Sequence, residues 1–366
     1  MQIRWVRGSD RISFNRPHTF FCLGVRGAAK STWLETIGCH YLEKGHGILY
    51  LFGSRDGEGL SWLRSPYAED KKILLVHGEN VSVKAPCDTK AATKVSLSDF
   101  EKYDIIISAS PLYLGPNDEF TCAAMLTDKI YKRLSWKRLV YCLCREAANL
   151  FYSRLKVSEN QIVSKAQMTY LIREARHVGL ALGLDSVRYY SIDIDIRTLS
   201  DYIILKSQGM TGLTSDLKWL YSLFEPSIIR NMPKQFFIIL SRRGSVGIGE
   251  FKEISWHKQE RENILKAVGV SVEYGEPIEK GEYRGAFKTV GDLEHAEIIK
   301  LYVEEGLSMN KIADQMGRSS RTPFKHVHQH NASVEGSGFC PSCRRVKSSL
   351  DSVLARRQRS PNLFRK

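Results

Sequence analysis

The amino-acid sequence predicts an α/β fold, in which a mostly parallel sheet is flanked by helices and followed by a small helical module. Two observations predict it. Over residues 15–245, apolar runs alternate with helical patterns, and several runs are continuous, as expected for strands covered on both faces. After residue 291, short amphipathic segments with a strongly basic end replace this pattern.

The expected elements alternate along the first part of the chain. Strands are expected at residues 20–23, 47–52, 72–76, 104–108, 139–144, 178–184, 202–205 and 235–240, and helices at residues 31–42, 119–134, 159–176 and 213–224. Strands connected through helices favour a parallel, doubly wound sheet. A ligand is therefore expected outside the carboxyl ends of the strands, beside the loop that follows the first of them.

That loop is close to a phosphate-binding loop. Residues 24–31 read GVRGAAKS, and only Ala29 departs from the pattern Gly, four residues, Gly-Lys-Ser/Thr. In this motif Lys30 reaches the β/γ-phosphates, Ser31 holds Mg²⁺, and backbone N–H groups surround the phosphate. A strand–helix turn with a chance lysine is the less favoured alternative. The predicted nucleotide-binding residues are Gly24, Val25, Arg26, Gly27, Ala28, Ala29, Lys30, Ser31 and Thr32.

A second motif supports a nucleotide hydrolase, which needs a strand that ends in carboxylates. The apolar run at residues 139–144 is followed by REAAN at residues 145–149. With the loop at residues 24–31, it resembles the HerA/FtsK-type P-loop ATPases, a group of DNA-translocating motors and viral genome-packaging ATPases. In that group the strand ends in Asp-Glu-Ala, so Arg145 stands where the Mg²⁺-supporting Asp is expected.

The resemblance covers about residues 15–245 and implies a RecA/FtsK-like P-loop NTPase domain that uses ATP and Mg²⁺. It implies Glu146 as the general base and a homo-oligomeric ring acting on DNA. Either Arg188 or Arg197 could act as an arginine finger in trans, with Arg197 as the catalytic candidate beside Lys30 and Glu146. An ion pair within the subunit is the commoner role of such arginines. A polar sensor, commonly Gln, is absent, and either Asp185 or Ser186 could replace it.

Two acidic stretches allow weaker predictions. Asp56 and Glu58 lie in a Gly-rich turn after the second expected strand, and we expect a solvent-exposed turn there rather than a loop near the phosphates. Asp193 and Asp195 are expected on an exposed face rather than as a metal pair.

The sequence divides into residues 1–250 as the ATPase domain, 251–291 as an irregular connector, 292–332 as a helix-turn-helix and 333–366 as a basic tail. Ser308 is expected to cap a helix at residues 309–316, Gly317 to form the turn, and residues 319–331 to form a basic second helix. That helix would enter the major groove of DNA. A packing appendage is the alternative. The predicted DNA contacts are Arg318, Ser319, Arg321, Thr322 and Lys325.

The charge distribution agrees with a polyanionic partner. The formal net charge is +14, and residues 318–366 contain eleven Lys/Arg against two acidic residues. The tail also holds Cys340 and Cys343 in a CxxC pair, and His326 and His330 share a helix face upstream. This set allows a structural Zn²⁺ site, or the histidines contact phosphate instead.

Composition indicates a globular protein for which we expect a cytoplasmic location. Six of the eight cysteines lie in apolar segments, which suits a reducing compartment, and no apolar run approaches a membrane span or a signal peptide. Two functions remain in competition: a DNA-associated ATPase motor, and a nucleotide-sensing DNA-binding regulator with slow or absent hydrolysis. A purely structural interaction protein is the least favoured hypothesis.

Overall fold

A computed structural model describes residues 1–51, 57–131, 138–152, 159–174, 177–257, 262–275, 290–317, 319–337, 340 and 343. The chain divides into two compact units, Met1–Pro277 and Ile278–Lys366. Within the described residues, no helix is both long enough and apolar enough to cross a membrane.

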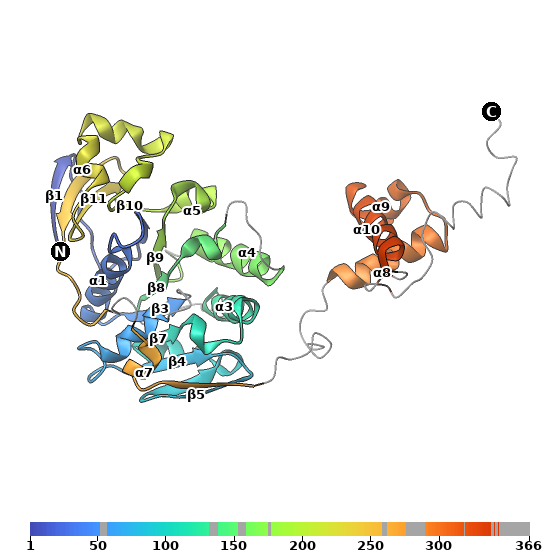
Figure 1. Cartoon of the computed structure of the whole chain (residues 1–366), viewed down its shortest axis with the longest axis horizontal. Helices are drawn as coiled ribbons and strands as arrows, with labels where there is room; N and C mark the ends of the chain where they lie inside the picture. The colour runs from blue at the N-terminus through green and yellow to red at the C-terminus, as the bar shows by residue number, and fades with distance from the viewer. Residues whose placement is uncertain are drawn as a thin grey trace, which may run out of the picture. The chain divides into compact units, whose positions relative to one another are not determined.

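The first unit is built on an eleven-stranded sheet with the order β1-β12-β11-β10-β2-β9-β8-β3-β7-β4-β6 (Figure 1). From β10 to β6 all neighbouring strands are parallel, whereas β1, β12 and β11 add an antiparallel edge beside β10. Two further strands, β5 and β13, lie outside this sheet and pair with each other. The described strands of the unit are β1 (Gln2–Arg7), β2 (Thr19–Leu23), β3 (Gly47–Leu51), β4 (Ile73–His77), β5 (Val81–Lys84), β6 (Asp88–Ala91), β7 (Ile105–Ser108), β8 (Val140–Cys144), β9 (Leu180–Ser186), β10 (Tyr202–Leu205), β11 (Phe236–Ser241), β12 (Val246–Glu250) and β13 (Ser271–Tyr274).

Helices cover this sheet. The α-helices of the first unit are α1 (Lys30–Glu43), α2 (Asp99–Lys102), α3 (Pro116–Tyr131), α4 (Glu159–Glu174), α5 (Ile194–Leu199), α6 (Pro226–Arg230) and α7 (Ile264–Ala267). The 3₁₀ segments are η1 (Glu58–Arg64), η2 (Ala92–Lys94), η3 (Ser110–Leu112), η4 (Ala147–Asn149), η5 (Tyr189–Ser191), η6 (Gly209–Thr211) and η7 (Ser215–Ser222). Helix α1 packs on β2, β3, β8 and β9, and its buried Trp33 meets Phe20 and Phe237 edge to face.

The predicted α/β fold with a mostly parallel sheet is confirmed, and a strand lies in each of the eight expected regions. The strands β2, β3, β7 and β8 are buried along their whole length, which explains their continuous apolar runs. The helix expected at residues 213–224 is the 3₁₀ segment η7. Sequence patterns missed β1 and β12, because the edge strand β1 is largely exposed and β12 contains two glycines.

The prediction that residues 251–291 form an irregular connector is wrong for their described first half. Ile264, Val268 and Val270 are buried in the main core, and β13 pairs antiparallel with β5 in a separate two-stranded sheet. Arg64 of η1 anchors the preceding stretch, since it donates hydrogen bonds to the carbonyl oxygens of Trp256 and His257. The first unit therefore extends beyond residue 250, to Pro277.

The second unit contains three helices, α8 (Val290–Val303), α9 (Met309–Met316) and α10 (Arg321–Ser337). As expected, Ser308 caps α9 through its side chain, and Gly317 ends that helix in a left-handed conformation. The buried core of the described part is small: Ile298, Ile299, Leu301, Ile312 and Val327. In α10, Val327 is buried but Phe324 is 61% exposed.

Candidate nucleotide site

The order of the parallel strands brings the two predicted motifs to one edge of the sheet. Strand β9 lies between β2 and β8, and β3 lies on the other side of β8. Leu23 pairs with Ser186, and Cys144 pairs with both Leu184 and Leu51. Since these strands are parallel, the residues that follow them meet at their carboxyl ends, where α/β sheets bind ligands.

The loop between β2 and α1 has the contacts of a phosphate-binding loop. The backbone N–H of Gly24 donates to the Ser186 carbonyl, and that of Val25 donates to the Ser207 carbonyl. Lys30 is buried, and its Nζ donates to the Val25 carbonyl at 3.1 Å, so the ammonium lies over the loop. No side chain caps the described N-terminus of α1, which leaves its first N–H groups for a ligand. The remaining loop residues fit this arrangement: Arg26 and Gly27 are exposed, and Ala28 and Thr32 are buried.

Each of the two motifs contains one non-glycine residue with a left-handed backbone. Ala29 has φ 59° and Glu146 has φ 48°, and among the described residues these are the two non-glycine positions with positive φ. A left-handed conformation costs an L-residue about 1–2 kcal/mol. Ala29 stands where the motif requires glycine, so the loop adopts the backbone of the motif in spite of the Cβ. Strain at two positions of one site is typical of functional sites.

Arg145 occupies the position of the missing Asp and is buried between carboxylates. Its Nη1 lies 3.0 Å from Oε2 of Glu58, and its Nη2 lies 3.2 Å from Oδ2 of Asp185. The side chains of Arg145 and Asp185 are only 4% and 1% exposed. Burial opposes the guanidinium charge, but Asp185, Tyr50 and Glu58 together hold the pKa of Arg145 well above its ordinary value. Arg145 therefore organises this site as a permanent cation.

Glu58 was not predicted as a site residue, and the expectation of a solvent-exposed turn is wrong for it. Its side chain is 23% exposed, and Oε2 lies 3.5 Å from Oγ of Ser31 as well as against Arg145. Two glycines make this approach feasible: Gly57 has φ 72°, and a Cβ on Gly59 would lie 2.5 Å from the Tyr50 ring. An acidic residue between two glycines, shortly after a strand, is the signal that could have identified it.

Glu146 belongs to the same cluster. Its backbone N–H donates to Oδ1 of Asp185 at 2.7 Å, which positions the start of η4. Burial and the charge of Asp185 raise the pKa of the Glu146 carboxyl, while Arg145 and Lys30 oppose that rise. A carboxylate with a raised pKa next to a phosphate-binding loop is suited to accept a proton from water.

Asp185 and Ser186 were the two alternatives for the polar sensor, and both lie at the end of β9. Asp185 is fully engaged with Arg145 and with the Glu146 backbone. The Ser186 hydroxyl donates to the Arg188 carbonyl and accepts from the backbone N–H of Arg188. Ser186 thus holds the exposed Arg188 close to the carboxyl end of β9.

Arg197 makes contacts within its own subunit. Its guanidinium lies over the rings of Tyr189 and Tyr190, at 4.7 and 5.0 Å from their centroids, and 3.7 Å from Asp216. The side chain is only 12% exposed. These contacts correspond to the ion-pair alternative considered from the sequence, and they leave Arg188 as the more accessible arginine.

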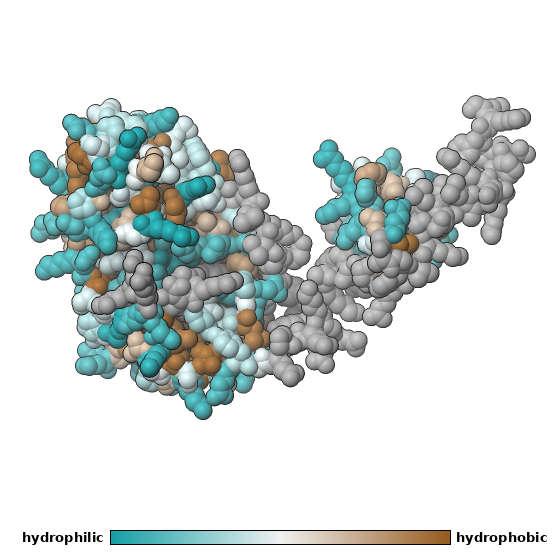
Figure 2. Space-filling model, in the orientation of Figure 1, coloured by the Kyte–Doolittle hydropathy of each residue, from teal (hydrophilic) through white to brown (hydrophobic). Residues whose placement is uncertain are grey.

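The residues predicted to contact DNA lie around the start of α10. Ser319, Arg321 and Lys325 are exposed, and Thr322 is half-buried. Arg318 lies outside the described residues. The face of the helical unit drawn in Figure 2 is largely hydrophilic where the structure describes it.

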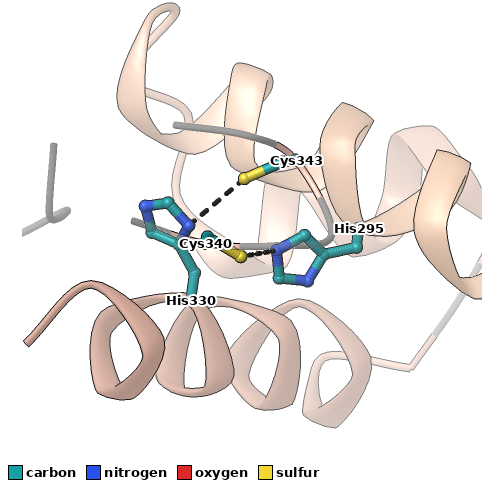
Figure 3. A group of neighbouring side chains, drawn as sticks. All are labelled: His295, His330, Cys340 and Cys343. Atoms are coloured by element: carbon teal, nitrogen blue, oxygen red, sulfur yellow. Dashed lines mark hydrogen bonds between the residues drawn. The ribbon is translucent and has the colours of Figure 1, made fainter. Parts of the chain in front are cut away.

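The predicted zinc residues require one correction. His330, Cys340 and Cys343 lie together, but the fourth member of this group is His295 of α8 rather than His326 (Figure 3). His326 and His330 do share a face of α10, as the spacing predicts. Spacing within one helix could not reveal a residue that another helix brings to the group.

The residues around the loop fit a nucleotide phosphate and its metal ion. The cradle of backbone N–H groups and Lys30 suits a phosphate, and Ser31 and Glu58 offer neighbouring oxygens to Mg²⁺. Glu58 thus places a carboxylate beside Ser31, whereas position 145 carries a cation. Arg145 neutralises part of the acidic charge at the same time.

Searches with protein-family models and among curated proteins found no match for this chain. Solved structures do match. The genome packaging NTPase B204 from Sulfolobus turreted icosahedral virus 2, in complex with AMP, is 16% identical with a TM-score of 0.38, covering 65% of this chain and 98% of that chain.

Two further structures match a similar part of the chain. Thermomonospora curvata EccC (ATPases 2 and 3) is 13% identical, with a TM-score of 0.36 over 67% of this chain and 38% of that chain. The pCW3 conjugation coupling protein TcpA, with ATPγS, is 15% identical, with a TM-score of 0.37 over 68% of this chain and 65% of that chain. Because these sequence identities and TM-scores are low, the function of this chain is inferred from its own residues.

Proposed function

We propose that this protein binds ATP with Mg²⁺ and hydrolyses it in association with DNA. The observation that carries the proposal is the convergence of Lys30, Ser31, Glu58 and Glu146 at the carboxyl edge of the parallel sheet. Bound Mg²⁺ would neutralise charge on the phosphates, and Ser31 and Glu58 would hold it.

Each side chain has a distinct part in this proposal. Lys30 leaves the Val25 carbonyl to bind the β/γ-phosphates, and Glu146 accepts a proton from the attacking water. Arg145 keeps Asp185 and Glu58 in position through its two ion pairs. Arg188 is the residue that would act in trans if subunits form a ring.

DNA association rests on the second unit and the basic charge of the chain. Arg321 and Lys325 are exposed on the first turns of α10, and Ser319 precedes that helix. In a helix-turn-helix this is the part of the second helix that meets bases and phosphates.

A DNA-stimulated ATPase assay tests the proposal. We expect Lys30→Ala to abolish nucleotide binding, and Glu146→Gln to retain binding while turnover falls by about 10²-fold or more. The control Glu69→Gln, at an exposed position, should match the wild type. Tight ATP binding without turnover in the wild-type protein would contradict the motor.

Such a result would favour the second candidate, a nucleotide-sensing DNA-binding regulator. The engagement of both Asp185 and Glu58 by Arg145 is the observation that favours it, because those oxygens are then less available to a metal ion. A measurement of the molecular mass in solution with ATP distinguishes the motor from the regulator independently. A strictly monomeric protein cannot supply Arg188 in trans.

DNA binding is tested with Arg321→Ala and Lys325→Ala. Each should weaken binding and reduce the salt dependence by about one ion per lost phosphate contact. Unchanged affinity in both variants would remove α10 from the DNA interface while leaving the ATPase proposal standing.

A further inference from the structure

We propose that His295, His330, Cys340 and Cys343 form a structural Zn²⁺ site that closes the C-terminal helical unit. One ligand atom from each of the four residues lies within 4.8 Å of all the others. Figure 3 shows the two imidazoles and the two sulfurs directed toward one another, from α8, from α10 and from the chain that follows α10. The nucleotide site plays no part in this inference.

The donor set is the one that Zn²⁺ prefers for structural sites. Two imidazole nitrogens and two thiolate sulfurs complete a tetrahedron without an open position. The Cys340 sulfur lies 3.3 Å from Nε2 of His295, and the Cys343 sulfur lies 3.4 Å from Nδ1 of His330. Zinc bonds of about 2.0–2.3 Å at tetrahedral angles require ligand-to-ligand distances of about 3.4–3.8 Å. The group therefore needs only a small adjustment to accept the ion.

Burial distinguishes this group from a chance surface cluster. His295 is 2% exposed, His330 is 0% exposed and Cys340 is 1% exposed. Polar side chains are rarely buried together beside a core this small, because each loses its hydration. Coordination to one metal ion would satisfy all four inward-directed atoms at once.

His326 supports the site in a different way. Its Nδ1 lies 3.2 Å from Nδ1 of His295, on the ring edge opposite the atom that faces Cys340. Histidines that bind zinc usually donate their second ring N–H to a neighbouring acceptor, which fixes the ring orientation and the tautomer. His326 is therefore assigned as the residue that positions His295.

The size of the unit explains why a metal would matter. Its described core contains five buried aliphatic residues, and the partly buried Cys343 packs against them. Domains of this size usually need a metal ion or disulfides to be stable. Cys340 and Cys343 are not joined in a disulfide. Zinc would join the first helix, the last helix and the chain beyond it, and so hold α10 in place.

Metal analysis of the purified full-length chain tests the site. We expect about one zinc per chain, lost in His295→Ala and in Cys340→Ser. The matched control His328→Ala, an exposed residue of α10, should retain zinc. His326→Ala should retain zinc but bind it about 10- to 100-fold more weakly. Loss of zinc in His326→Ala with full retention in His295→Ala would overturn the assignment of ligands.

Replacement of zinc by Co²⁺ gives a spectroscopic readout of the site in the wild-type chain. The proposal requires the visible absorption of tetrahedral Co²⁺ and the near-ultraviolet thiolate band, reduced by Cys343→Ser. Chelation should unfold the helical unit, with loss of helical circular dichroism, while the melting transition of the first unit stays unchanged. A wild-type chain with less than about one-tenth zinc, no tetrahedral cobalt spectrum and no response to chelator would overturn the site.

Discussion

Arg145 and Glu58 form an ion pair at 3.0 Å, between a residue that follows β8 and a residue of η1. Arg145 holds Asp185 with the other side of its guanidinium, and Glu58 reaches toward Ser31. Arg145 thus joins two carboxylates that come from different elements of the chain.

The first prediction concerns the buried pair of Arg145 and Asp185. Arg145→Met should lower the free energy of unfolding by about 3–5 kcal/mol, because it leaves Asp185 buried without a counter-charge. Adding Asp185→Asn should recover part of that loss in urea denaturation. Arg173→Met, which breaks an exposed ion pair with Asp195, should cost at most about 1 kcal/mol. Equal losses in the two single variants would contradict the structural role of Arg145.

The second prediction concerns Glu58 as the metal-supporting carboxylate. Glu58→Gln should raise the Mg²⁺ concentration needed for ATP binding about tenfold, which corresponds to about 1.4 kcal/mol. The measurement is a Mg²⁺ titration with a fluorescent ATP analogue, with Glu69→Gln as the exposed control. An unchanged Mg²⁺ dependence would exclude Glu58 from the metal site.

The third prediction concerns the left-handed backbone at Ala29. Ala29→Gly should stabilise the protein by about 0.5–1 kcal/mol, because relief of strain exceeds the added freedom of the unfolded chain. The neighbouring Ala28→Gly lacks that strain and should destabilise by about 1 kcal/mol. Thermal denaturation measures both. A loss of stability in Ala29→Gly comparable to that in Ala28→Gly would show that Ala29 is not strained.

The fourth prediction is a pH dependence at the ion pair of Glu35 and His257. Glu35 is fully buried, and its Oε2 lies 2.6 Å from Nδ1 of His257. Burial alone would lower the pKa of His257, but the charge and the hydrogen bond of Glu35 raise it. A raised histidine pKa adds stability below the unfolded pKa of about 6.5, and that stability is lost as the pH rises through the folded pKa.

Accordingly, His257→Gln should cost about 3 kcal/mol at pH 6 and progressively less toward pH 9. Urea denaturation at several pH values measures this difference. His40→Gln, at the exposed pair with Glu43, should show little change at any pH. A cost that stays constant from pH 6 to pH 9 would mean that the pair carries no charge.

Local patterns predicted much of the first unit because its strands are buried on both faces. The continuous apolar runs of β3, β7 and β8 identified the strands without knowledge of their neighbours. The motif that contains Lys30 and Ser31 was recognised in the same way, because its pattern consists of consecutive residues. Short elements such as α7 and β13 were missed, because four residues are too few to show a periodic pattern. Their apolar residues are recognised only by their packing on the main core.

The sequence by itself determined the α/β class, the loop with the phosphate-binding pattern, the arginine at the position of the expected Asp and the C-terminal helices at residues 309–316 and 319–331. Only the tertiary structure showed that Glu58 pairs with Arg145, and that His295 rather than His326 lies together with His330, Cys340 and Cys343. In both cases the decisive partner comes from a different element of the chain. The pairing of β3 with β8 and the packing of α8 on α10 bring these side chains together, and no local spacing encodes such a contact.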